Sequence, residues 1–518
     1  MIYPIDEQNF ECLRRDGKVY VDKTALIHQM ISTHKYYFLS RPRRFGKSLL
    51  ISTLKAYFQG KRELFENLAI NSLTKNWTVH PVFHFDMSTV VANDACRTRL
   101  SIENQLIEYE LLYNIPQNPQ ITLGNRFGTI VKSAVKQSGQ TAVVLIDEYD
   151  APILNVIDHD EEKIDEFRSI LNEFFSSLKD LSENLRFVLI TGITKFSQMS
   201  IFSKLNNLNN ISMDSEYDTI CGISNEELTT TLKQGIQNLA KTIDESYEDT
   251  ITLLRQHYDG YHFSSAMNDV YNPFSILNVL SKRRLDNYWF GSATPTFLLK
   301  LIKKNNGISI NNIENARVTS ASFDKAAENL TDFVPMLFQS GYLTTRDFNR
   351  QTQAYTLGFP NDEVRVGMSQ TLLTALTSNA ISKSADTFYI DFRDAIFTND
   401  IDKCLVLIRT FLGKIPSRLS QHREDYFQTI LYSVFKMCGA NIRCEVEVSA
   451  GKLDILMQTS TTTYIMELKY DKSPNEALKQ IDSKNYPFAY ADSNQKIVKV
   501  GINFSLKLGT LMEWKIVE

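Results

Sequence analysis

Cysteine is scarce in this chain. Six of the 518 residues are cysteine, and no two of them have the CxxC spacing of a zinc site. So few thiols in so long a chain also argue against a disulfide framework. We therefore expect a reduced, cytoplasmic protein.

Long hydrophobic runs and a strong excess of charge are missing as well. No apolar stretch approaches the length of a bilayer-spanning helix, and Met1 to Glu7 lack the basic and apolar parts of a secretion signal. The sequence therefore predicts no membrane partner. The formal net charge is −4, so no overall basic field indicates nucleic acid, although a local groove can be basic on a near-neutral chain. With 43% hydrophobic and 22% charged residues the chain is an ordinary globular one, and its length predicts about three domains.

Glycine is missing at one position of a loop that otherwise has the pattern of a phosphate-binding loop. The segment Arg41-Pro42-Arg43-Arg44-Phe45-Gly46-Lys47-Ser48-Leu49 follows an apolar run and precedes helical apolar spacing. A strand, a turn ending in Gly-Lys-Ser and a helix is a layout that binds nucleotide phosphates, so all of these residues are candidate ATP-binding residues. In it, Lys47 reaches the β- and γ-phosphates and the Ser48 hydroxyl binds Mg²⁺. Arg41 stands where the first glycine is usual, and an ordinary helix N-terminus explains this segment alone equally well.

A second segment favours the nucleotide interpretation. Ala142 to Ile146 is a continuous apolar run typical of a strand buried on both faces, and it ends in Asp147 and Glu148. Ligands of parallel sheets bind outside the carboxyl ends of the strands. Asp147 can hold Mg²⁺ through water, and Glu148 can orient or deprotonate the attacking water.

A third strand, Leu185 to Gly192, ends near Thr191 and Thr194, which are candidate sensors of the γ-phosphate, although a plain Thr-Gly turn explains them as well. Strands alternating with helices predict an α/β domain with a mostly parallel sheet. Val19 to Thr24 is a further strand-like piece. We expect this domain to cover residues 1–289.

The middle of the chain carries no chemical motif. After helical pieces, Phe338 to Thr345 and Gln353 to Phe359 are two strand-like runs separated by a polar loop, which predicts a small winged-helix-like module. Residues 366–418 have helical patterns. We expect residues 290–418 to be this module and a helical connector, and 419–518 to be a separate domain.

The last hundred residues contain a second set of candidate catalytic residues. Glu424 precedes an apolar helix, Asp454 lies on a predicted strand, and Glu467 and Lys469 lie two residues apart on the next. Residues two apart on a strand point to one face. Asp454 and Glu467 are then Mg²⁺ ligands, Lys469 positions the metal-activated water, and Glu424 completes the site.

A following helix contains Gln480. This order of elements is expected of a PD-(D/E)XK nuclease. A surface strand carrying a Glu–Lys pair is the alternative explanation.

With these segments assembled, the chain resembles the AAA-ATPase-like proteins that carry a C-terminal PD-(D/E)XK nuclease domain. The resemblance spans nearly the whole chain and rests on Tyr20-Val21-Asp22-Lys23-Thr24, Arg41 to Ser48, Leu145 to Asp150, Phe202 to Leu208, Tyr258-Asp259-Gly260-Tyr261, Asn272-Pro273-Phe274-Ser275, Gln339 to Thr344, and Asp454 with Glu467-Leu468-Lys469. It implies a P-loop NTPase domain that binds ATP, a restriction-endonuclease-like α/β domain at the C-terminus, and a loop that characteristically has Arg in place of the first Gly. The proline of the nuclease motif is replaced by Leu453.

Two functions follow. In the first, ATP binding or hydrolysis controls Mg²⁺-dependent cleavage of DNA or RNA. In the second, the protein is a nucleotide-dependent switch whose C-terminal domain binds nucleic acid or protein without cutting, which the lack of a basic run there keeps open. Assembly into a homo-oligomer is also open, with Arg41, Arg43 and Arg44 as candidates for an arginine supplied in trans.

Overall fold

The chain forms two compact units, Met1–Phe297 with Arg317–Glu363, and Leu298–Ala316 with Val364–Glu518. Residues 317–363 of the predicted middle region thus belong to the same unit as the phosphate loop. The computed structural model describes residues 1–90, 94–156, 161–194, 207–293, 316–323, 334–368, 385–413, 424–449, 451–491 and 495–518. Most of the Phe202–Leu208 motif lies outside the described residues, as does part of the predicted connector. In the described part of the chain, no helix is both long and apolar enough to cross a membrane.

The first unit is built on a parallel sheet with strand order β2-β3-β4-β1-β5. The strands are β1 (Tyr36–Ser40), β2 (Val82–Asp86), β3 (Ala142–Asp147), β4 (Leu185–Gly192) and β5 (Asn209–Asn210). Strands β1, β3 and β4 are buried along nearly their whole length, because helices cover both faces of a parallel sheet. The predicted α/β fold with a mostly parallel sheet is confirmed.

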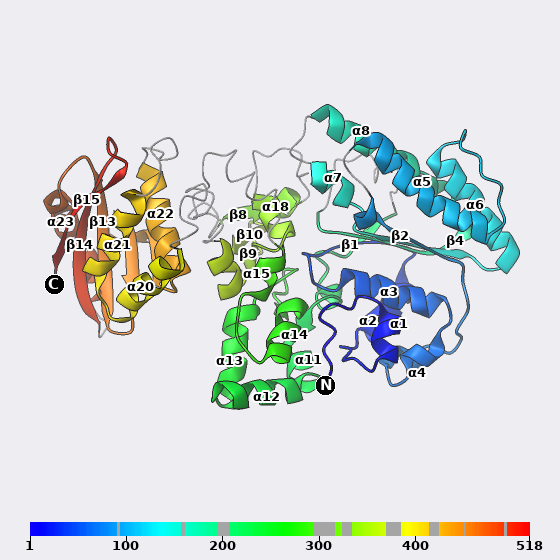
Figure 1. The fold of residues 1–518 in the computed structure, drawn as a ribbon, viewed down its shortest axis with the longest axis horizontal. Helices are drawn as coiled ribbons and strands as arrows, with labels where there is room; N and C mark the ends of the chain where they lie inside the picture. The colour runs from blue at the N-terminus through cyan, green and yellow to red at the C-terminus, as the bar shows by residue number, and fades with distance from the viewer. Residues whose placement is uncertain are drawn as a thin grey trace. The chain divides into compact units, whose positions relative to one another are not determined.

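Helices α1 to α4 lie on one face of this sheet, and α5, α6 and α8 on the other (Figure 1). Phe83 and Phe85 of β2 pack on aromatic residues of α5, α6 and α8. The residues between and after them, His84 and Asp86, therefore face the α3 side. The helices are α1 (Phe10–Arg15), α2 (Thr24–Thr33), α3 (Lys47–Phe58), α4 (Ala69–Leu73), α5 (Ala95–Leu112), α6 (Leu123–Ser138), α7 (Ala151–Val156), α8 (Glu161–Phe175) and α9 (Ser177–Asp180), with 3₁₀ turns at Arg62–Phe65, Met87–Thr89 and Ser182–Asn184.

The strand expected at Val19–Thr24 does not form. Val19 and Val21 pack instead on the core of the helical subdomain described next. The Asp22 carboxylate accepts hydrogen bonds from the backbone N–H groups of Thr24 and Ala69, each at 2.8 Å, so side-chain contacts replace a strand ladder.

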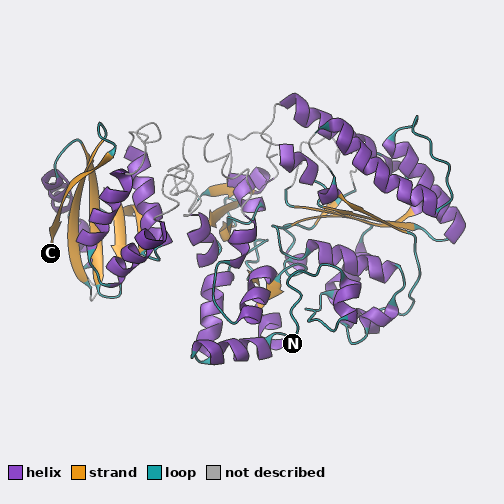
Figure 2. Ribbon diagram, viewed as in Figure 1, coloured by secondary structure: helices purple, strands orange, loops and turns teal. Residues whose placement is uncertain are grey.

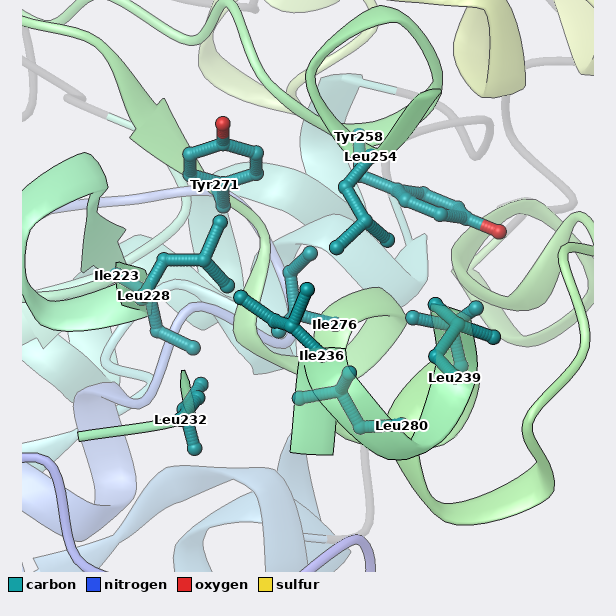
Figure 3. Packing of buried hydrophobic residues seen from close by; sticks show 11 residues of the cluster. Ile223, Leu228, Leu232, Ile236, Leu239, Leu254, Tyr258, Tyr271, Ile276 and Leu280 are labelled. Carbon is teal, nitrogen blue, oxygen red and sulfur yellow. The ribbon is translucent and has the colours of Figure 1, made fainter. Parts of the chain in front are cut away.

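Residues 223–282 form a helical subdomain with its own core. Leucine, isoleucine and tyrosine side chains from its helices and its two short strands point into one buried cluster (Figure 3). The elements are β6 (Ile223–Ser224), α11 (Asn225–Thr230), α12 (Lys233–Ile243), α13 (Tyr247–Tyr258), β7 (Val270–Tyr271) and α14 (Pro273–Lys282).

The winged-helix-like module completes the first unit. Short helices separate its first strand from a β-hairpin, and the three strands form an antiparallel sheet in the order β8-β10-β9. The expected strand at Phe338 begins only at Thr344, because the preceding residues form a helix and a turn at Gly341 (φ 88°). The elements are α15 (Tyr288–Ala293), β8 (Arg317–Thr319), α17 (Ser320–Phe323), α18 (Val334–Gln339), β9 (Thr344–Asn349) and β10 (Ala354–Gly358).

The second unit contains a mixed sheet in the order β11-β12-β13-β14-β15, in which only β13 and β14 run parallel (Figure 2). Neighbouring residues of β13 contact different helices, since Lys469 is bonded to Gln480 of α23 and Tyr470 to Glu424 of α22. Successive side chains of a strand point to opposite faces, so α22 and α23 cover opposite faces of the sheet. The elements are α20 (Ala385–Phe397), α21 (Ile401–Gly413), α22 (Glu424–Met437), β11 (Asn441–Val448), β12 (Gly451–Gln458), β13 (Thr462–Tyr470), α23 (Pro474–Ser483), a 3₁₀ turn at Tyr486–Tyr490, β14 (Lys496–Ser505) and β15 (Thr510–Val517).

Candidate nucleotide and nuclease sites

The loop between β1 and α3 has the backbone geometry of an anion-binding turn. Arg44 (φ 67°) and Gly46 (φ 96°) are left-handed, and Gly46 is the N-cap of α3. Amides of such a turn point into one concavity, and the helix N-terminus adds the positive end of its dipole. Apart from Gly46 itself and its two chain neighbours, no atom of the described residues lies within 4 Å of the position of a Cβ atom on Gly46, so this side of the turn is open.

Lys47 lies within this loop. Its ammonium donates hydrogen bonds to the carbonyl oxygens of Arg41 (3.0 Å) and Pro42 (3.1 Å), and the side chain is buried. Lys47 also lines a cavity of about 860 Å³ together with Ser48, Leu49, Asp147 at the end of β3 and Glu148 after it. The loop therefore places an ammonium, a hydroxyl and backbone amides at the edge of one cavity.

Arg41 has a structural role that the sequence did not reveal. Its guanidinium donates to the carbonyl oxygens of Ser212 (2.7 Å) and Tyr217 (3.1 Å) and lies 4.0 Å from the ring centroid of Phe263. Burial lowers the pKa of Arg41 to about 10. The expectation that this side chain contacts phosphate or acts in trans is therefore corrected, because its guanidinium holds the loop to residues 212–217.

The side chains of Pro42 and Phe45 pack on neighbouring residues on the side of the loop that faces away from the cavity. A Cβ atom on Gly341 would come within 2.6 Å of the Pro42 Cβ. The Phe45 ring packs edge-on against the rings of Tyr261 (4.9 Å) and Phe263 (5.4 Å). The side chains of these two residues thus pack behind the loop, and neither residue lines the cavity.

Arg43 and Arg44 differ from Arg41, because both line the cavity. The Arg44 guanidinium lies 4.9 Å from the ring centroid of Phe274 in the helical subdomain. These are the two arginines of the loop whose position suits a contact with phosphate.

Thr191 connects the acidic strand end to the loop strand. Strand β4 lies between β1 and β3, and the Thr191 hydroxyl donates to Asp147 Oδ1 at 2.6 Å. Glu148 has a left-handed backbone (φ 48°), a strained conformation of the kind found at functional sites. Burial raises the pKa of Glu148, while the positive charge of Lys47 opposes this shift.

Thr194, the second sensor candidate, has a different partner. Its hydroxyl donates to Asp150 Oδ2 at 2.7 Å, and Asp150 is fully buried. Thr194 therefore anchors the turn after β4 and does not contact Asp147.

His84 and Asp86 line the same cavity and were not singled out from the sequence. Asp86 pairs in register with Asp147 across neighbouring strands. The available signal was the alternation of aromatic and polar residues in β2, which predicts a polar face beside the acidic strand end. Residues of the N-terminal segment, such as Gln8, line the cavity too and have no motif.

In the second unit, β12 and β13 separate at the candidate catalytic residues. Their backbone pairing ends at Ile455 and Met466. Two residues further along β13, the backbone N–H group of Leu468 donates instead to a side chain of β12, Asp454 Oδ2, at 2.8 Å. A cavity of about 490 Å³ opens at this point, lined by Asp454, Glu467, Lys469 and Glu424. The strands thus bring the predicted residues together in one cavity.

Lys469 is held between a carboxylate and an amide. Its ammonium donates to Glu467 Oε1 (3.1 Å) and to Gln480 Oε1 (2.8 Å). Burial and the negative charge of Asp454 raise the pKa of Glu467, and burial raises that of Asp454. Lys469 acts against both shifts, which is the electrostatic role expected of a cation beside two acids.

The residues present fit a divalent cation. Glu467 Oε2 is buried and accepts no hydrogen bond from the described residues, and carboxylate oxygens are the ligands that Mg²⁺ prefers. In the described ranges no group of three or more His, Cys, Asp and Glu side chains forms a ready-made metal site. The metal-ligand roles of Asp454, Glu467 and Glu424 stay predictions, as do those of Ser48 and Asp147 in the first unit.

Two further residues of this cavity were missed. Gln428 follows Glu424 by one helical turn and donates to the Asp454 carbonyl at 3.4 Å, so i, i+4 spacing was its signal. Glu445 has a left-handed backbone (φ 52°) and pairs with Lys452 at 2.6 Å. Nothing in the sequence marks Glu445, because its place depends on that local backbone conformation.

The fold and the two cavities define a P-loop protein with a PD-(D/E)XK-type domain. The sequence profile described as "Predicted AAA-ATPase" matches residues 4–202, and that of the PD-(D/E)XK nuclease superfamily matches residues 422–514. The chain is 31% identical over 512 residues to "Uncharacterized protein in vnfD 5'region" of Azotobacter chroococcum mcd 1, covering 97% of this chain and 96% of that protein. The chain therefore belongs to the family of AAA-ATPase-like proteins with a C-terminal PD-(D/E)XK nuclease superfamily domain, which confirms the resemblance and the predicted fold class.

Among solved structures, the crystal structure of Cdc6p from Pyrobaculum aerophilum is matched at 11% identity, over 66% of this chain and 87% of that one. The TM-score is 0.20, which is too low to support an argument.

Proposed function

We propose that this protein is a cytoplasmic, ATP-controlled nuclease. ATP bound and hydrolysed in the first unit controls the Mg²⁺-dependent cleavage of phosphodiester bonds of nucleic acid in the second. The observation that carries the proposal is the cavity of Asp454, Glu467 and Lys469, in which a buried carboxylate oxygen of Glu467 has no partner among the described residues.

The division of labour in the first unit follows from the contacts. Loop amides and Lys47 bind the phosphates, and Ser48 and Asp147 hold the cation. Glu148 accepts a proton from the attacking water, and its raised pKa, caused by burial, makes it a stronger base than an exposed glutamate. Thr191 orients Asp147.

In the second unit, Asp454 and Glu467 hold the cation and Lys469 orients the attacking water. Mg²⁺ supplies a bound water of lowered pKa and stabilises charge on the phosphate. Gln480 fixes the Lys469 ammonium. Glu424 and Gln428 of α22 line the same cavity.

The test is cleavage of single-stranded DNA, duplex DNA and RNA by the purified full-length protein with Mg²⁺, with and without ATP. We expect Lys469→Ala to reduce cleavage by about 100-fold or more. Lys479→Ala, which removes an exposed lysine one residue from Gln480 on the same helix, is the matched control and should cut normally. Full cutting by Lys469→Ala overturns the nuclease assignment.

The alternative function is a nucleotide-dependent switch that binds nucleic acid or protein without cutting. Four acidic residues line the cavity, Glu424, Glu445, Asp454 and Glu467, against two lysines, and this charge balance is the observation in its favour. Nucleotide-dependent binding of nucleic acid with no cleavage under any condition selects this alternative.

A further inference from the structure

Trp289, in α15 of the winged-helix-like module, is buried against the phosphate loop. The side chain is 1% exposed, and its indole N–H donates to the carbonyl oxygen of Arg43 at 3.1 Å. On its other side the ring packs against Tyr342, with the ring centroids 5.4 Å apart. Trp289 therefore contacts the loop from outside the cavity, whose lining does not include it.

Gly341 lies at the same contact. Its backbone is left-handed (φ 88°), and a Cβ atom there would lie 2.6 Å from the Pro42 Cβ and 3.5 Å from Trp289 Cζ2. The turn after α18 thus leaves no space between the module, the loop and the indole.

Glu363 holds Trp289 in turn. The backbone N–H of Trp289 donates to Glu363 Oε1 at 2.6 Å, and the other carboxylate oxygen accepts the Ser275 hydroxyl at 2.7 Å. Ser275 lies in the first turn of α14, next to Pro273 and Phe274, which line the nucleotide cavity. Glu363 is 2% exposed and is the last residue of the first unit.

We propose that Trp289 is a positioning residue for the phosphate loop, and that with Glu363 it links the conformation of this loop to the end of the first unit. The inference rests on the proposed nucleotide binding. In a planar trans peptide the C=O of one residue and the N–H of the next point in opposite directions. By fixing the Arg43 carbonyl, the indole therefore aims the Arg44 amide away from itself, towards the cavity that Arg44 lines.

The first experiment uses the chain's own tryptophans, of which there are three, Trp77, Trp289 and Trp514. The double variant Trp77→Phe, Trp514→Phe leaves Trp289 as the single indole fluorophore. We expect its emission to change on titration with ATP and Mg²⁺ and to saturate at the same concentrations as ATP binding. This measurement leaves the proposed contact intact and so does not depend on whether a Trp289 variant folds.

The second experiment removes the hydrogen bond. Trp289→Phe keeps an aromatic ring and loses the donor to Arg43, and we expect ATP to bind about tenfold more weakly. Trp77→Phe is the matched control: the Trp77 indole N–H is buried without a partner among the described residues, so ATP affinity should stay unchanged.

A second pair of variants tests the same contact sterically. Gly341→Ala pushes on Pro42 and should also weaken ATP binding. Gly139→Ala also places alanine on a left-handed backbone (φ 69°), but no described atom beyond the two chain neighbours lies within 4 Å of its Cβ atom, so it should not weaken ATP binding.

The outcomes separate the two proposals. If the wild-type protein binds ATP while Trp289→Phe binds it as well as Trp77→Phe does, the positioning role is overturned and nucleotide binding stands. Constant emission of Trp289 at saturating ATP has the same meaning. If the wild-type protein binds no ATP, the proposed function of the first unit fails, and this inference fails with it.

Discussion

Thr191 contacts the acidic strand end and not the phosphate loop, so its hydroxyl should matter for hydrolysis more than for binding. We expect Thr191→Val to slow ATP hydrolysis about tenfold while ATP affinity stays within about twofold, because the loss of one hydrogen bond misorients Asp147. Phosphate release and ATP titration measure the two quantities. Thr250→Val, which removes a buried hydroxyl bonded within α13, is the control. An affinity loss as large as the rate loss would contradict the assignment.

Glu363 should make the stability of the first unit depend on pH. Burial raises its pKa to about 7 from 4.5, so its stabilising contribution is fully present below pH 4.5 and is lost as the pH rises towards about 7. Glu363→Gln cannot ionise. We therefore expect the variant to gain about 2–3 kcal/mol of unfolding free energy relative to wild type between about pH 5 and about pH 8.

Urea unfolding of both proteins at the two pH values measures this difference. Any effect of the substitution that does not depend on pH cancels when the difference at the lower pH is subtracted from that at the higher pH. A gap that does not change with pH would show that Glu363 has the same pKa in the folded and unfolded chain.

Single residues were predictable where a motif fixes their spacing. The structure places Lys47, Ser48 and Asp147 on one cavity, and Asp454, Glu467 and Lys469 on another, as their patterns require. Roles that depend on distant partners were not predictable. Trp289 donates a hydrogen bond to Arg43, 246 residues away in the sequence. Arg41 donates to carbonyl groups more than 170 residues away.

The N-terminal segment is joined to α11 by an ion pair. Lys23 Nζ lies 2.6 Å from both carboxylate oxygens of Glu227, which also accepts the Ser224 N–H in a capping box. Burial lowers the pKa of Lys23. Removal of Glu227 leaves a mostly buried ammonium unpaired, so we expect Glu227→Ala to cost about 2 kcal/mol of unfolding free energy, a value reduced for partial exposure.

Chemical denaturation measures this cost. The neighbouring Glu226 is exposed, and Glu226→Ala is the matched control. Equal stability of the two variants would mean that the ion pair contributes nothing.

Elements were predictable where both faces of a strand are buried. Strand β4 begins and ends at the predicted residues, because its apolar stretch at residues 187–190 is the pattern of a strand buried on both faces in an alternating α/β chain. The strand at Val19–Thr24 was wrong, because β-branched residues can be buried by a neighbouring helical core without any strand partner. Residues 225–243 form two helices, α11 and α12, and side-chain periodicity does not record the break between them.

At the scale of the whole molecule, a ligand that binds one unit should stabilise that unit alone. At a constant concentration of Mg²⁺, we expect ATP to stabilise the first unit by about 2.7 kcal/mol at a hundredfold excess over Kd, and so to raise its unfolding temperature. The unfolding temperature of the second unit should stay unchanged. Calorimetry of the full chain measures both transitions. Lys47→Ala should abolish the shift, and an equal shift of both units would indicate that they unfold together.

The order of the units along the chain has a consequence for synthesis on the ribosome. Residues of the first unit are complete at Glu363, before any strand of the second sheet is made. Strand β13 carries Glu467 and Lys469, and its parallel partner β14 is translated after it. A polypeptide whose translation stops before β14 therefore contains all residues of the first unit up to Glu363 and a strand β13 without its parallel partner. The phosphate loop is in place in every nascent chain before the second cavity can form.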